Sequence, residues 1–288
     1  MRINELYKQK KTVVSLEIFP PKKDSGVTTL YDTLREIKNL APDFISVTYS
    51  AGGSGNSEKT VQIASDIKKV YGIESMAHLT CIKAEEDDID RFAESLLQNG
   101  VDNIMSLRGD IPAGNTDPLG QFRFAKDLIS YIKEKYPTFC IGAAAYPEGH
   151  IACDNLDLSL DHLKEKVDAG AEFLVTQLFF DNDYFYNFYD KALKKGINIP
   201  VSAGVMPILS RSQIEKMIFM CGVSLPSGIV RLLNKYESDP VSLKKAGIDH
   251  AVNQLLDLCE HGVPGVHIYT MNQPDIAKEC MQKVREVI

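Results

Sequence analysis

The sequence predicts an α/β fold, a single TIM (β/α)8 barrel, and three observations support this prediction. Eight short apolar segments alternate with segments of helical periodicity, at intervals of roughly 30 residues typical of βα units. Such an alternation requires parallel strands, and eight parallel strands can close into a barrel. Polar residues gather at the carboxyl ends of these strands, where TIM barrels place their active sites. A doubly wound open sheet is the alternative, but eight units without a second domain favour closure.

The composition narrows the class of protein. The chain has 288 residues, of which 44% are hydrophobic, and a net charge of -7, which argues against nucleic-acid binding or a membrane surface. No run of 18 apolar residues and no cationic-apolar leader occur, so we expect a cytoplasmic protein. The six cysteines form no CxxC pair, which predicts reduced thiols and no metal site.

The predicted elements begin with a helical, polar leader over residues 1–12. Eight short apolar segments are predicted as strands: 13–19, 44–49, 75–81, 103–110, 140–146, 173–180, 201–206 and 265–270. Pro20 stops the first strand. A glycine-rich segment at 51–55 leads to a helix over 57–71, with Asn56 or Ser57 as its N-cap. The next helix ends at Asn99 and Gly100, a typical helix stop.

The second half contains one elaboration. A loop with Pro112, Gly114 and Pro118 leads to a helix that ends near Tyr136. The region 225–262 holds more helix than one crossover needs, so we expect extra helices in the last unit and contacts in a homo-oligomer. All of 1–288 is predicted to form one catalytic domain.

The fourth strand ends in a charged segment that we take as the centre of a site. Arg108 and Asp110 are two residues apart, so they project to the same side of an extended chain and can pair. Gly109 between them allows a ligand to approach the backbone. Other strand ends also carry polar groups: Glu17, Thr48, His78, Tyr146 with Glu148, Gln177 and Tyr269. Each alone could be a core polar group, but together they predict an enzyme. No Gly-Lys-Ser/Thr phosphate loop, G-x-G-x-x-G or G-x-S-x-G motif accompanies them.

Seven motifs in order give the chain a more specific resemblance. They occupy residues 16–21, 46–49, 78–81, 107–110, 145–150, 166–171 with 176–181, and 267–272. From about residue 13 to the C-terminus, the chain closely resembles the methylenetetrahydrofolate reductase family, of the bacterial type with a catalytic domain only. The resemblance implies an FAD-containing TIM barrel that oxidises NADH or NADPH and reduces 5,10-methylenetetrahydrofolate to 5-methyltetrahydrofolate. It implies ping-pong hydride transfer through FAD, with the nicotinamide and the folate as small-molecule partners.

The resemblance also implies roles for single residues. Glu17 matches the general acid that helps to open the folate's five-membered ring, and Asp110 matches the acid beside the flavin that also contacts the pterin. Gln177 matches a residue that contacts both exchanging substrates, and Gln213 and Tyr269 match substrate-side positions. The FAD-contacting positions are Thr48, His78, Leu107, Arg108, Gly109, Asp110, Phe124, Ala125, Tyr146, His150 and Lys166.

Five positions depart from the family pattern. Ser159, His162 and Glu165 stand where it has an acid, an amide and a base, Met217 where an aromatic is common, and Gln273 where an arginine is common. The sequence leaves open whether the donor is NADH or NADPH. Two other functions also stay open: a flavin subunit fed by a partner protein, and a pterin-binding TIM-barrel methyltransferase.

Overall fold

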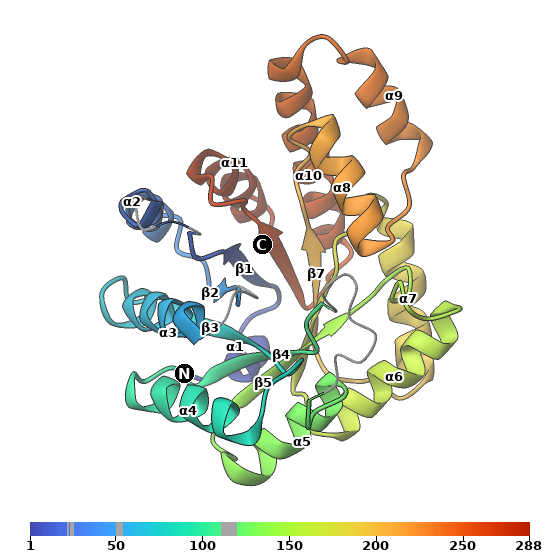
Figure 1. The fold of residues 1–288 in the computed structure, drawn as a ribbon. Coiled ribbons are helices and arrows are strands. Elements are labelled where there is room, and N and C mark those ends of the chain that lie inside the picture. The colour runs from blue at the N-terminus through green and yellow to red at the C-terminus, as the bar shows by residue number, and fades with distance from the viewer. Residues whose placement is uncertain (22, 24–25, 50–53, 111–119) are drawn as a thin grey trace.

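The computed structural model describes residues 1–21, 23, 26–49, 54–110 and 120–288. Eight parallel strands form a closed barrel in chain order, with β8 paired to β1, so the predicted TIM barrel is confirmed (Figure 1). The predicted segment around Gly52 and the loop with Pro112, Gly114 and Pro118 lie outside the described residues. The strands are β1 (Val13–Ile18), β2 (Phe44–Val47), β3 (Glu74–Thr80), β4 (Asn103–Leu107), β5 (Cys140–Ala145), β6 (Phe173–Thr176), β7 (Val201–Val205) and β8 (Gly265–Tyr269).

Helices cover the outside of this barrel (Figure 1). They are α1 (Ile3–Gln9), α2 (Val27–Lys38), α3 (Ser54–Lys69), α4 (Glu86–Gln98), α5 (Ala125–Lys135), α6 (Leu156–Asp168), α7 (Asn182–Lys194), α8 (Arg211–Cys221), α9 (Ser227–Lys235), α10 (Pro240–Glu260) and α11 (Pro274–Arg285). In the described part of the chain, none of them is both long enough and apolar enough to span a membrane.

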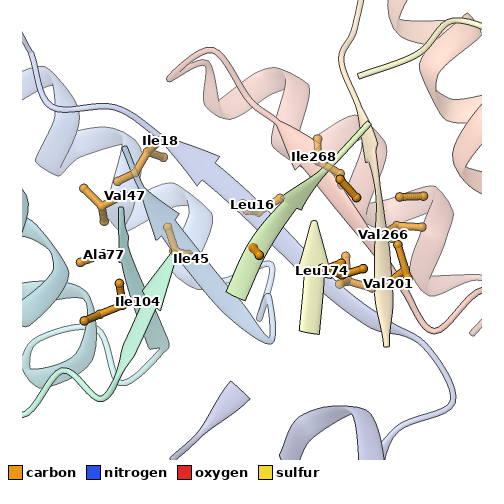
Figure 2. Packing of buried hydrophobic residues seen from close by; sticks show 14 of the residues in the cluster. Leu16, Ile18, Ile45, Val47, Ala77, Ile104, Leu174, Val201, Val266 and Ile268 are labelled. Carbon is orange, nitrogen blue, oxygen red and sulfur yellow. The ribbon is translucent and has the colours of Figure 1, made fainter. Parts of the chain in front are cut away.

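The strands alternate between two environments, as a period of two requires. Leu16 and Ile18 of β1 join the large apolar cluster between the strands and the outer helices, as do Val266 and Ile268 of β8 (Figure 2). The residues between them face the barrel interior. Polar groups such as Glu17 therefore lie inside the barrel while their neighbours anchor the strand to the helical layer.

The amino end of the barrel is closed by α1. Ile3 is fully buried, and it packs with Leu6 against inward side chains near the strand starts, including Phe44, Met105 and Phe173. The backbone N–H of Ile3 donates to Oδ1 of Asn103 at 2.8 Å. The predicted helical leader is confirmed, and Ile3 and Leu6 form an apolar face that closes the amino end of the barrel.

The helices α8, α9 and α10 extend outward from the barrel on the side of β7 (Figure 1). They share an apolar cluster with residues that follow β6 and β7, among them Leu178, Phe180, Met206 and Ile208. Strand β6 stops at Thr176, four residues earlier than predicted, because Leu178 and Phe180 turn away into this cluster.

Two other local predictions were wrong. Helix α3 begins at Ser54, so Asn56 and Ser57 lie within the helix and neither is its cap. Strand β4 ends at Leu107, and Gly109 has φ +89°, which is not extended backbone. In the described part of the chain, Arg108 and Asp110 form no ion pair within 4 Å, contrary to the pairing expected from an extended strand.

Candidate active site

Two cavities meet at the carboxyl end of the barrel. The central cavity has a volume of about 350 Å³. Its lining residues include Glu17, Thr48, His78, Leu107, Arg108, Gly109, Asp110, Tyr146, His150, Gln177 and Tyr269. The side cavity has a volume of about 240 Å³. Its lining residues include Leu107, Arg108, Phe124, Ala125, Tyr146, His150 and Lys166. Four of these residues line both, so the cavities adjoin. A larger cleft of about 520 Å³ between α7, α9 and α10 contains none of the predicted site residues.

Glu17 lies at the centre of a polar cluster inside the barrel. Its Oε2 is 3.5 Å from Nε2 of His78 and 3.5 Å from Nε2 of His267. The strand register explains the arrangement, because Glu17 is aligned with Ser46 on β2 and with Tyr269 on β8. The Glu17 side chain keeps 19% of its surface exposed, whereas that of His267 keeps 1%. The carboxyl group thus reaches the cavity, which His78 and His267 also line.

Each histidine is held by a serine. Ser46 Oγ is 2.6 Å from Nε2 of His78, and Ser15 Oγ is 2.7 Å from Nδ1 of His267. Ser15 Oγ also donates to the carbonyl of Val266 at 3.2 Å. A hydroxyl has a single proton, so both contacts of Ser15 are satisfied when His267 donates from Nδ1. Nε2 of His267 then faces Glu17, and this buried nitrogen has no hydrogen-bond partner among the described residues.

Burial sets the charge of the other groups here. It lowers the pKa of His78 below its usual value, although the Glu17 carboxyl group opposes this shift, so His78 is neutral near pH 7. The Tyr269 hydroxyl donates to the carbonyl of Thr176 at 2.7 Å, and burial raises its pKa well above the usual value. Gly204 makes room for this ring, since a Cβ there would lie 2.9 Å from the Tyr269 hydroxyl.

The mouth of the central cavity is formed by Gln177 and Asp110. Gln177 Oε1 accepts from the backbone N–H of Leu178 at 2.9 Å. This bond fixes the amide, and the Nε2 donors have no partner among the described residues. Asp110 is exposed at the cavity edge, in contrast to Glu17. The mouth therefore offers both donors and an acceptor to a bound molecule.

The inner end of the side cavity is cationic. Lys166 Nζ donates to the carbonyl of Ala144 and lies 5.5 Å from the centre of the Tyr146 ring. Burial lowers the pKa of Lys166 to about 8. His150 packs edge-on against Tyr146, with ring centres 4.7 Å apart. Burial, followed by the nearby charges of Arg108 and Lys166, lowers the pKa of His150. These groups would favour an anion.

The outer end of the side cavity contains the three departures on α6. Ser159 Oγ accepts from the backbone N–H of His150 at 3.1 Å, so it positions that loop. Glu165 pairs with Lys126 at 2.9 Å and lies 3.5 Å from His162. Phe124 and Ala125 form an adjacent wall, with the Phe124 ring half exposed.

Several residues singled out from the sequence lie elsewhere. Gln213 lines neither cavity, because its amide bonds the backbone of Leu209 and Pro207 before α8. Met217 packs in the outer cluster of α8–α10, and Gln273 accepts from Lys244 at 2.8 Å. Glu148 also lines neither cavity; its Oε2 accepts from the backbone N–H of Ser224.

Sequence reasoning missed three members of the central cluster, namely Ser15, Ser46 and His267. Each lies two residues before a predicted site residue, Glu17, Thr48 and Tyr269 respectively. Side chains two apart on a strand face the same side, so this spacing would have found them. These three side chains form the layer immediately below the strand ends.

The chain was compared with known proteins. A family model described as methylenetetrahydrofolate reductase matches residues 2–285. Methylenetetrahydrofolate reductase (NADH) 1 of Arabidopsis thaliana is 35% identical over 284 residues, covering 94% of this chain and 48% of that protein. Methylenetetrahydrofolate reductase 1 of Schizosaccharomyces pombe is 37% identical, covering 96% and 46%. The chain thus spans about half the length of these two relatives. The 5,10-methylenetetrahydrofolate reductase of Escherichia coli is 34% identical, covering 92% and 88%.

Solved structures resemble the chain in fold. A protein from Clostridium thermocellum, described as binding two copies of 5-methyl-5,6,7,8-tetrahydrofolic acid, matches with a TM-score of 0.66 and 16% identity, covering 100% of this chain and 99% of that one. Thiamine phosphate pyrophosphorylase from Pyrococcus furiosus matches with a TM-score of 0.52 and 13% identity, covering 98% and 99%. At these identities the likeness concerns the barrel architecture alone.

Proposed function

Because the chain belongs to the methylenetetrahydrofolate reductase family, we propose that it reduces 5,10-methylenetetrahydrofolate to 5-methyltetrahydrofolate, with FAD as cofactor and NADH or NADPH as electron donor. The observation that carries this proposal is the Glu17 cluster beside a cationic side cavity. The alternatives of a partner-fed flavin subunit and a methyltransferase are tested below.

The adjoining cavities fit a flavin dinucleotide. The inner end of the side cavity brings Arg108, Lys166 and His150 together, and these groups would hold the pyrophosphate. His150 Nδ1 accepts from the backbone N–H of Ala152 at 3.0 Å, so the neutral ring keeps its proton on Nε2 as a donor. Leu107, Tyr146 and Phe124 supply apolar surface for ring systems. When bound, FAD supplies the hydride relay between nicotinamide and folate.

Glu17 is proposed to protonate the leaving amine that opens the folate's five-membered ring. His267 Nε2 faces Glu17 Oε2 at 3.5 Å and has no hydrogen-bond partner among the described residues. Ser15 maintains the arrangement by engaging Nδ1. Ser15 thus holds His267 beside Oε2, the carboxyl oxygen from which we propose that the substrate receives its proton.

Asp110, Gln177 and Tyr269 are proposed to orient the substrate at the cavity mouth. The free donors of Gln177 and the carboxylate of Asp110 can pair with the polar edge of a pterin or with a carboxamide. Both exchanging substrates carry such groups. Gln213 is proposed to act at longer range, by ordering the loop before α8.

The test is an anaerobic absorbance experiment on the purified full chain. We expect flavin absorption that NADH or NADPH bleaches and that methylenetetrahydrofolate then restores. Flavin absorption that neither nicotinamide bleaches would instead favour a flavin subunit fed by a partner protein. A chain that stays colourless after incubation with FAD would contradict the proposal and favour the methyltransferase.

A further inference from the structure

The side cavity contains positive charge that lacks a balancing carboxylate. Among the described residues, no carboxylate oxygen lies within 4 Å of Lys166 Nζ, and its hydrogen-bond acceptor is the backbone carbonyl of Ala144. Two nearby lysines are different, because Lys126 pairs with Glu165 at 2.9 Å and Lys164 pairs with Asp168. A buried ammonium with only a carbonyl and an aromatic face is poorly compensated.

The groups that face Lys166 do not supply a negative charge near neutral pH. Tyr146, at the end of β5, has a pKa raised to about 12 by burial, so its hydroxyl stays protonated. Arg108, after β4, is always charged. His150, in the loop before α6, has a lowered pKa and is neutral near pH 7, although Asp110 opposes this shift. Cys153, in the same loop, is a free cysteine that opposes the lowering of the Lys166 pKa by burial.

Lys166 is therefore a group whose protonation depends on what fills the cavity. Its pKa of about 8 in the unliganded protein means that half of the molecules carry a neutral amine at that pH. A bound anion would compensate the ammonium and raise this pKa. His150 titrates at lower pH, so the two proton equilibria are separated.

We infer that a pyrophosphate-bearing ligand entering the side cavity drives uptake of a proton at Lys166, so that its affinity falls as the pH rises. This inference rests on the proposed function, in which the ligand is FAD. At a pH below the pKa of Lys166 in the unliganded protein, Lys166 is already protonated and ligand binding takes up no proton. Above it one proton is taken up per site, and affinity falls by about tenfold per pH unit until the pKa of the complex is reached.

Calorimetric titration of the apoprotein with FAD tests the inference, because proton uptake is measured directly. FAD is a suitable probe since its phosphates are diesters without a proton to lose in this range. Titrations in two buffers of different ionisation enthalpy, at pH 7, 8 and 9, give the number of protons bound. We expect this number to rise from near zero at pH 7 toward one at pH 9. A constant number near zero, with affinity independent of pH, would overturn the inference.

Variants assign the proton to a residue. Lys166→Arg stays charged at every pH, and Lys166→Met cannot titrate, so we expect both to lose the pH-dependent uptake. We also expect the Met variant to bind FAD more weakly. If the Arg variant does not fold, the Met variant alone tests the assignment. Lys164→Met, on the same helix but outside the cavity, should keep the wild-type uptake. Wild-type uptake in Lys166→Met would show that another group takes the proton.

Failure of the proposed function is distinguishable from failure of this inference. If FAD does not bind at any pH, the cofactor assignment is wrong, and ADP-ribose, a pyrophosphate diester without flavin, replaces it as probe. Proton uptake with ADP-ribose that Lys166→Met abolishes would still support the inference. Absence of uptake, or absence of ADP-ribose binding, would overturn it.

Discussion

The two ends of the barrel are built from the same eight strands, yet they differ in how their charged side chains are paired. At the amino end, Glu172 accepts from Arg2 at 2.6 Å and from Lys133 at 2.5 Å, and Lys68 lies 3.0 Å from Glu74. At the carboxyl end, no carboxylate of the described residues lies within 4 Å of Lys166 or Arg108. Single polar atoms lack partners at both ends, such as Ser75 Oγ and His267 Nε2. What differs is the pairing of these charged groups: Glu172 and Glu74 have cationic partners near α1, whereas Lys166 and Arg108 have no carboxylate partner among the described residues where ligands are expected.

This contrast separates stability from function within one sheet. A buried charge without a partner destabilises the unliganded protein. Such a charge is therefore expected where a bound ligand compensates it. We therefore expect substitutions at the amino end to change the free energy of unfolding and those at the carboxyl end to change reaction steps. Four predictions test this division, in order of decreasing effect.

Glu17→Gln should give the largest effect. Loss of the proposed general acid should lower the rate of folate reduction on the order of 10²–10⁴-fold, while reduction of the flavin by NADH stays near wild type. Rapid-mixing measurements of the two half-reactions check this. Glu172→Gln, an acid at the opposite end, should leave both rates unchanged. An equal loss in both half-reactions of Glu17→Gln would remove the general-acid role.

Ile3→Ala should act through stability alone. The side chain is fully buried against the strand starts, so its truncation should lower the free energy of unfolding by about 2–5 kcal/mol. Urea denaturation followed by circular dichroism measures this change. Below the unfolding transition the variant should bind FAD as wild type does. A lowered affinity would contradict the proposed separation of stability at the amino end from function at the carboxyl end.

Ser15→Ala should have an intermediate effect on chemistry. It removes the acceptor that fixes the His267 tautomer, and a net hydrogen-bond loss near 1 kcal/mol corresponds to about a fivefold to tenfold slower folate half-reaction. Ser202→Ala is the matched control, since Ser202 is equally buried but bonds Tyr7 at 2.8 Å on the amino side. Similar kinetics for both variants would argue that the Ser15 hydroxyl has no role in positioning.

Asp110→Asn should give the smallest effect. A carboxylate beside the flavin disfavours added negative charge on its reduced form, so its removal should raise the flavin potential. Because Asp110 is exposed and screened by solvent, we expect a rise of up to about 15 mV, equivalent to about 0.7 kcal/mol for two electrons. Equilibrium dye titration measures it, and an unchanged potential would contradict the electrostatic role.

The barrel and most of the cavity lining were predictable because they depend on local patterns. Alternation of strand and helix predicts closure, and strand ends predict the rim that carries Glu17, His78 and Tyr269. The Ser15–His267 pair was missed because it depends on register between β1 and β8. The conformation of Gly109 was missed because no alternation pattern determines where a strand stops. The α1 plug was missed because only two apolar side chains, Ile3 and Leu6, form its buried face.

The pairing of β1 with β8 has a consequence for how the molecule comes into being. Ser15 and His267 are separated by 252 positions in the chain, and Thr270 bonds the carbonyl of Glu17 at 2.7 Å across a similar span. Such distant contacts form late, because loop closure must precede them. During synthesis, β1 has an unpaired edge until β8 has left the ribosome, and Glu17 lacks His267 for the same period. The proposed proton-donating site is therefore completed by the same event that closes the barrel, so its chemistry would report on the last step of folding.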